Sequence, residues 1–250
     1  KLSDYHKAEE KANDLSYGIA GTPTSNGLKH LIASLYQLSK PADNTGREDG
    51  EDGNKDINEK GNEKGRNDIA NTDGDARADF SKNVFLTPSG LFSISFTLQA
   101  LLKTGDELLI TDSVYSPTRR FCKNILHKNN IHTKYYHPTI DAESLGNLIS
   151  ENTRVIYLES PGSIMFEMQD IDAIITVVNK INATRGADRK IITIFDNSWA
   201  TALHFNPLDY GIDIVIEAIT KYISGHSDIL MGCVATRSCV IASLLQTAYR

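Results

Sequence analysis

The feature that most constrains the fold of this chain is a regular alternation of two kinds of apolar segment after residue 82. Short runs with few polar interruptions, such as Glu107–Thr111, Arg154–Glu159 and Lys190–Asp196, have the length and composition of strands. Between them lie segments of helical length, such as Gly90–Lys103 and Ile171–Ala183. Strands this apolar are covered on both faces, and parallel strands need helical crossovers. The pattern therefore predicts an α/β fold with a mainly parallel sheet flanked by helices.

The other segments of this region follow the same alternation. Strands are predicted at Asn83–Thr87, Ile131–His137, Ile212–Ala218 and Met231–Thr236, and helices at Pro117–Lys128, Ala142–Ser150 and Val240–Tyr249. Ligands of such sheets bind beyond the carboxyl ends of the strands. We therefore expect the functional residues directly after the predicted strands.

An acidic insert at residues 41–82 precedes the first predicted strand. Residues 43–79 hold 12 acids and 6 bases, while the chain has 32 acids and 26 bases, so the remainder is neutral with 20 of each. Ile57 and Ile69 are the only branched aliphatics in that stretch, which predicts disorder. Its acidic runs lack the spacing of an EF-hand calcium loop. The predicted organisation is an N-terminal arm and helix at 1–40, the insert, and a large cofactor-binding domain at 83–250.

Charge and cysteine content limit the partners of the protein. Because the chain outside the insert has no basic excess, nucleic acid is not an expected partner. No apolar run approaches the ~20 residues of a membrane span. The three cysteines are far apart and odd in number, which indicates a reducing, cytoplasmic location. No Cys/His cluster has the spacing of a metal site.

Three positions carry residue types that suit chemistry. Ser89 and Gly90 fall at a helix start, which favours an anion, although a plain N-cap explains them equally well. Asp196 ends an apolar strand, where a carboxylate needs a cation such as a protonated ring nitrogen; the alternative is a surface Asp that caps a turn. Lys221 follows another apolar strand, where a partly desolvated amine can act as a nucleophile; the alternative is a solvated lysine.

Several strings of this chain together resemble the cysteine/methionine-metabolism family of enzymes that depend on pyridoxal 5′-phosphate (PLP). They are SVYSPTRRFC at 113–122, LESPGSI at 158–164, DNSWA at 196–200 and AITKYISGHSD at 218–228. The resemblance covers roughly residues 15–39 and 83–250 in the family's order. It implies the large domain of the PLP-transferase fold. We expect the smaller C-terminal domain of the family to be missing, because the chain stops at Arg250.

The resemblance implies roles around the cofactor ring. Lys221 would join PLP covalently and later move the α-proton of the substrate. Asp196 would pair with the protonated ring nitrogen, and Tyr115 would stack on the ring. Trp199 would line the substrate entrance; a buried core aromatic is the alternative reading of this residue.

The resemblance also implies a phosphate site. Ser89, Gly90 and Leu91 would hold the phosphate through the helix start, helped by the hydroxyl of Thr220. Tyr17 matches a tyrosine that the family's N-terminal segment contributes to a neighbouring subunit.

The chain also departs from the family at the phosphate site. Ile19 stands where the family has an arginine, so a bidentate phosphate partner is lost there. The pair Arg119–Arg120 looks like the signature of the lyases, but nothing in the sequence shows that it replaces the missing phosphate-binding arginine.

The implied activity is cleavage of the β-carbon–sulfur bond of cystathionine, a small sulfur amino acid, to homocysteine, pyruvate and ammonia. Related γ-lyases and γ-synthases typically carry S-N-P where this chain has Gly162–Ser163–Ile164, which favours β-cleavage. A γ-reaction and a non-catalytic remnant of the family both stay open. The resemblance also implies a homotetramer built as a dimer of dimers.

Overall fold

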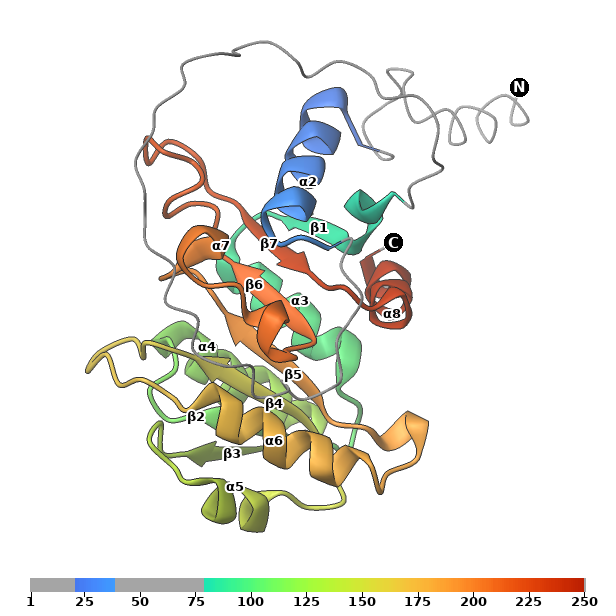
Figure 1. The fold of residues 1–250 in the computed structure, drawn as a ribbon, viewed down its shortest axis with the longest axis vertical. Helices are drawn as coiled ribbons and strands as arrows, with labels where there is room; N and C mark the ends of the chain where they lie inside the picture. Colours follow the sequence, from blue (N-terminus) through green and yellow to red (C-terminus); the bar gives the residue numbers. More distant parts are fainter. Residues whose placement is uncertain (1–20, 39–78, 250) are drawn as a thin grey trace, which may run out of the picture.

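The computed structural model describes residues 21–38 and 79–249, and Tyr17, Ile19 and most of the predicted insert lie outside this range. The described chain contains a seven-stranded sheet (Figure 1) with the strand order β1-β7-β6-β5-β4-β2-β3. Its strands are β1 (Val84–Thr87), β2 (Glu107–Thr111), β3 (His132–Tyr136), β4 (Thr153–Glu159), β5 (Ile192–Asp196), β6 (Ile214–Glu217) and β7 (Gly232–Ala235).

Most neighbouring strands are parallel. The four pairs formed by β3, β2, β4, β5 and β6 in spatial order are parallel, and β7 is antiparallel to both β6 and β1. In this register Glu159 lies opposite Asp196, and Asp196 lies opposite Ile216. The predicted α/β class with a mainly parallel sheet is confirmed.

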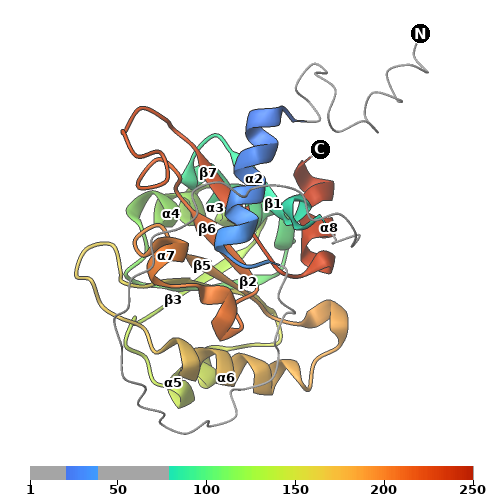
Figure 2. The ribbon, with the colours of Figure 1, turned by 45° about the horizontal axis from the view of Figure 1, so that its top comes forward.

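Helices cover both faces of the sheet (Figures 1 and 2). One face packs against α3 (Gly90–Leu101), α4 (Ser116–Phe121) and α8 (Cys239–Tyr249), and the other against α2 (Pro23–Leu35), α5 (Ala142–Leu148) and α6 (Ile171–Asn182). A short helix, α7 (Thr201–His204), follows β5. No helix in the described ranges is long and apolar enough to cross a membrane.

The core has two layers because side chains alternate across each strand. In β5, Ile194 packs in the cluster with α3 and α8, whereas its neighbour Phe195 packs in the cluster with α6. Both side chains are fully buried. This two-sided burial explains why the sequence of β5 is apolar throughout instead of alternating with polar residues.

Two predicted segments differ from the structure. The predicted helix Pro117–Lys128 is regular only to Phe121; a π-helical segment, Cys122–Leu126, and a 3₁₀ turn, His127–Asn129, follow. At the end of the predicted insert, Asp79 caps a 3₁₀ helix over Phe80–Asn83, so these last residues have defined structure. Short polar segments next to a sheet can be ordered by caps that composition alone does not reveal.

Candidate active site

The predicted site residues lie at one edge of the sheet, where the parallel strands end. Asp196 ends β5, and Lys221 follows the neighbouring β6 by four residues. Because β1 is antiparallel to β7, and β7 to β6, the carboxyl end of β1 with Ser89 lies at this same edge. The segment after β6 contacts the segment after β5, since the backbone N–H of Ala218 donates to Ser198 Oγ at 2.8 Å.

Asp196 is a partly buried carboxylate held by two donors. The backbone N–H of Ser198 donates to Oδ1 at 3.0 Å, and the Tyr157 hydroxyl donates to Oδ2 at 3.3 Å. Burial raises the pKa of Asp196, and these hydrogen bonds partly offset that rise. The structure thus places an acceptor of positive charge at the end of β5.

Two further acids flank Asp196 at the ends of β4 and β6. Glu159 and Glu217 are both buried, and burial, followed by the nearby Asp196, raises the pKa of Glu159 to about 7. The pKa of Glu217 is also about 7, mainly through burial, with a smaller rise from Asp196 and an opposing hydrogen bond from Tyr36. In residues 21–38 and 79–249, no lysine, arginine or histidine forms an ion pair with any of these three acids. Buried negative charge without a cation is costly, so this acidic row attracts protons or a cationic ligand.

The start of α3 offers backbone donors. Ser89 is the N-cap, and its hydroxyl accepts from the N–H of Phe92 at 3.1 Å. The N–H groups of Gly90 and Leu91 find no acceptor within the described chain, as expected for the first turn of a helix. A Cβ on Gly90 would lie 2.6 Å from that of Ala218, so only glycine lets this helix start approach the end of β6. Such a helix start suits an anion.

Lys221 and Thr220 differ in how free their side chains are. The side chain of Lys221 is exposed, which favours a solvated lysine over a partly desolvated amine, and no described residue pairs with its ammonium. The Thr220 hydroxyl donates to the Met231 carbonyl at 3.0 Å and accepts from the Met231 N–H at 2.9 Å. Its one proton is therefore used within the protein and reaches a phosphate only if that bond opens.

The two predicted aromatic residues are exposed. Tyr115 is the N-cap of α4, and its side chain is 45% exposed. Trp199 is 57% exposed, and its ring lies 5.5 Å from that of Phe166. The alternative reading of Trp199 as a core residue is therefore wrong.

Sequence reasoning missed the residues that support this edge. Tyr157, Ser198 and Glu159 contact predicted site residues. Ser198 and Glu159 lie within strings that carry the family resemblance, but neither was assigned a role. The apolar pattern identifies Tyr157 only as a strand residue. It does not indicate that the Tyr157 hydroxyl on β4 contacts Asp196 on the neighbouring strand β5. Only the paired register, which the sequence does not state, brings them together.

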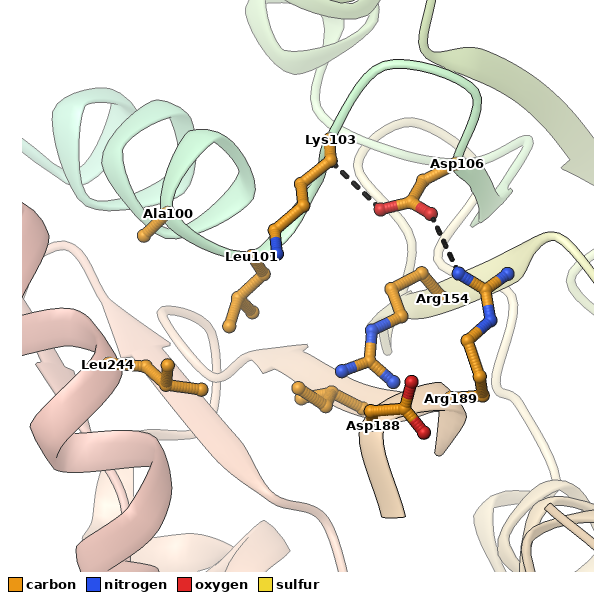
Figure 3. Close-up of a pocket in the computed structure, with 9 residues that line it drawn as sticks. Ala100, Leu101, Lys103, Asp106, Arg154, Asp188, Arg189 and Leu244 are labelled. Atoms are coloured by element: carbon orange, nitrogen blue, oxygen red, sulfur yellow. Dashed lines mark hydrogen bonds and ion pairs between the residues drawn. The ribbon is translucent and has the colours of Figure 1, made fainter. Parts of the chain in front are cut away.

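A charged cavity of about 200 Å³ lies elsewhere, at the opposite edge of the sheet (Figure 3), and no predicted site residue lines it. Asp106 accepts there from the Lys103 backbone N–H at 2.8 Å and pairs with Arg189 at 3.4 Å. Burial lowers the pKa of Arg154 in the same wall. These contacts tie the loops at the amino ends of the strands together.

Comparison with known proteins agrees with this fold. The family model for the Cys/Met metabolism PLP-dependent enzymes matches residues 76–249. Over 164 residues the chain is 36% identical to cystathionine beta-lyase MetC of Escherichia coli, covering 66% of this chain and 40% of that protein. It is 39% identical to an L-alanine/L-glutamate racemase of Wolbachia pipientis over 175 residues, covering 70% and 40%.

A solved structure is similar as well. The crystal structure of cystathionine gamma-lyase from Lactobacillus plantarum, complexed with L-serine, matches with a TM-score of 0.61 and 25% identity. The match covers 66% of this chain and 41% of that one. The chain thus spans about two fifths of the length of each of these proteins.

Proposed function

The chain belongs to the Cys/Met-metabolism family of PLP-dependent enzymes, and from this premise we propose that it carries the cofactor site of a carbon–sulfur β-lyase. The proposed reaction consumes cystathionine and water and releases homocysteine, pyruvate and ammonia. We propose this activity for the whole protein, because the chain spans about two fifths of the length of its relatives.

The residues at the carboxyl edge fit PLP in four respects. The free N–H groups of Gly90 and Leu91 suit its phosphate, and Asp196, without a cation among the described residues, suits a protonated ring nitrogen. The exposed amine of Lys221, unpaired in the described ranges, suits its aldehyde. The exposed ring of Tyr115 is available to stack.

When bound, PLP supplies an electron-accepting ring that stabilises the negative charge left on the α-carbon of an amino acid. The protein's own residues would do the rest. Asp196 orients the ring nitrogen and keeps its proton in place, with Tyr157 and Ser198 fixing the carboxylate. The amine of Lys221 takes the α-proton of the substrate. Trp199, exposed at the same edge, would line the substrate entrance.

The observation that carries the proposal is the row of three acids formed by Glu159, Asp196 and Glu217. Burial raises the pKa of Asp196, and Asp196 in turn raises the pKa of both buried neighbours, so negative charge in this row is unfavourable in the absence of a cation. PLP, the cofactor of this family, would supply that cation through its protonated ring nitrogen. A surface aspartate that only caps a turn would need no such setting.

Gly162 supports β-cleavage over γ-cleavage. A Cβ at this position would lie 2.5 Å from the Cβ of Ser113, so the S-N-P string of the γ-enzymes would require the loop to move. The name of the E. coli relative agrees with this reading, while the names of the racemase and the gamma-lyase give the rival reactions.

Product analysis of the full-length protein tests the proposal. Incubation with PLP and cystathionine should yield pyruvate and homocysteine in equal amounts. Production of 2-oxobutyrate and cysteine would contradict β-cleavage. Interconversion of alanine enantiomers without pyruvate would instead identify a racemase.

The oligomeric state stays a prediction. Tyr17, which the resemblance assigns to a neighbouring subunit, lies outside the described residues. We propose a homotetramer, and sedimentation of the full-length protein distinguishes it from a monomer.

A further inference from the structure

Glu159 joins two segments of the carboxyl edge that are far apart in sequence. It ends β4 and is 8% exposed. Its Oε2 accepts from the backbone N–H of Tyr115 at 2.8 Å, and its Oε1 accepts from the Ser163 hydroxyl at 2.6 Å. Both oxygens are therefore occupied by donors from outside β4, which is a bidentate use of one carboxylate.

The Glu159 carboxylate binds the backbone of Tyr115, whose side chain is not held in place by packing. Tyr115 is 45% exposed, and its side chain makes no capping hydrogen bond at α4. The direction of its ring therefore depends on how its backbone is held. A second bond strengthens the same junction, because the Ser163 N–H donates to the Ser113 carbonyl at 2.9 Å.

We propose that Glu159 is a positioning residue of the cofactor site, which fixes Tyr115 and the loop at Ser163 relative to Asp196. The inference rests on the proposed function, in which Tyr115 and Asp196 contact PLP. It adds a residue that touches neither the cofactor nor the substrate and acts through the two donors that it holds.

Charge is a separate property of the same group. Glu159 lies opposite Asp196 of β5 and close to the Tyr157 hydroxyl of its own strand, and Glu167 is the titratable residue of the adjoining loop. A protonated Glu159 could still accept from the Tyr115 N–H and could donate to the Ser163 hydroxyl. Hydrogen-bond geometry and charge can therefore be changed independently.

Two substitutions separate these properties. Glu159→Gln keeps the length and both contacts, because its amide oxygen can accept from the Tyr115 N–H and its NH₂ can donate to Ser163 Oγ. Glu159→Asp keeps the charge but is one methylene shorter, so it cannot reach both donors. The matched control, Glu107→Asp, shortens an acid that is 6% exposed at the start of β2, at the opposite edge of the sheet, and contacts Thr153 and Lys134 instead.

The experiment measures the visible circular dichroism of bound PLP, which reports the orientation of the cofactor, and the Kd of the full-length protein for PLP. Glu159→Asp should at least halve the ellipticity per bound PLP and raise the Kd about tenfold, as expected for the loss of a charged hydrogen bond. Glu159→Gln and Glu107→Asp should stay within about twofold of the wild type in both quantities.

The outcomes are distinct. Equal dichroism and affinity in Glu159→Asp and the wild type would overturn the inference, as would a loss in Glu159→Gln as large as in Glu159→Asp. If Glu159→Asp does not fold, Ser163→Ala removes one donor and should raise the Kd about threefold; no change there would also overturn it. Failure of the wild type itself to bind PLP would contradict the proposed function instead.

Discussion

Three neighbouring parallel strands end in an acid, namely Glu159, Asp196 and Glu217. The protonation state of each of these carboxyl groups contributes to the charge of the carboxyl edge. Glu217 differs from the other two because it faces the N-terminal helix. Its Oε2 accepts from the buried Tyr36 hydroxyl at 2.5 Å, and its Oε1 has no partner within the described chain. An acid in this position is more stable with its proton than without it.

Glu217 should make the protein less stable as the pH rises towards neutrality. Its folded pKa of about 7 lies above the unfolded value of 4.5, so the folded state holds the proton more tightly. The stability that this provides is complete below pH 4.5 and is lost as the pH rises through about 7. The full difference is about 3 kcal/mol.

Glu217→Gln should remove that part of the pH dependence, because the amide keeps an acceptor for Tyr36 but does not titrate. Urea unfolding at pH 5 and pH 8 measures it. The gain of the variant over the wild type should increase by about 2–3 kcal/mol between these conditions. A gain that is the same at both pH values would contradict the raised pKa of Glu217.

Gly90→Ala should disturb the helix start that we assign to the phosphate. The new methyl would lie 2.6 Å from the Ala218 Cβ, which should cost about 1–3 kcal/mol of unfolding free energy. It should also weaken PLP binding, since α3 must move. Gly146→Ala, in helix α5, is the control: its methyl would lie 3.8 Å from Val177, so it should not destabilise. Equal effects in both variants would contradict this role of Gly90.

Single residues were predictable where a local pattern marks them. Asp196 ends an apolar strand and Lys221 follows one by four residues, and the rule for ligand sites in parallel sheets points to such positions. The contact of Tyr36 with Glu217 spans 181 residues, and no local pattern indicates it. The Thr220 hydroxyl, taken up by Met231, likewise depends on a tertiary contact.

At the scale of elements, Arg237 after β7 holds the C-terminal end of α2 against the sheet. It is 8% exposed and donates to the carbonyls of Tyr36, Gln37 and Leu208 and to the Asp209 carboxylate. These four contacts place α2, and with it Tyr36, beside β6. The docking therefore rests on polar contacts as well as on apolar burial.

Arg237→Met should destabilise the protein by about 3–5 kcal/mol, because it leaves buried carbonyls and a carboxylate without donors. Arg120→Met, at an exposed position whose side chain forms no ion pair or hydrogen bond among the described residues, should change stability by less than about 0.5 kcal/mol. Urea unfolding compares the two. A loss below 1 kcal/mol in Arg237→Met would mean that apolar packing alone holds α2.

Most elements were predictable because each has a clear period or a clear end signal. The strand Glu107–Thr111 has the predicted bounds, and Gly90–Leu101 ends two residues before the predicted helix end. The π-helical segment Cys122–Leu126 was not predictable, since its letters suit a regular helix. The short helix α7 was missed because four residues are too few for a periodic pattern.

At the scale of the whole molecule, the sheet buries both of its faces and leaves its carboxyl edge open for chemistry. The three acids reach this edge from β4, β5 and β6, the start of α3 reaches it from β1, and Lys221 reaches it from β6. The site therefore exists only when the sheet is assembled. The edge also carries exposed apolar side chains, including Trp199 and Phe166. Ligands of such sheets bind beyond the carboxyl ends of the strands, and the chain belongs to a PLP-dependent family.

The most direct test of this account is to find which lysine carries the cofactor. The full-length protein is loaded with PLP, reduced with borohydride and digested, and the masses of the peptides are measured by mass spectrometry. The account predicts one modified peptide, which contains Lys221, and no modification in Lys221→Ala. Cofactor attached to a different lysine, or spread over several, would contradict it.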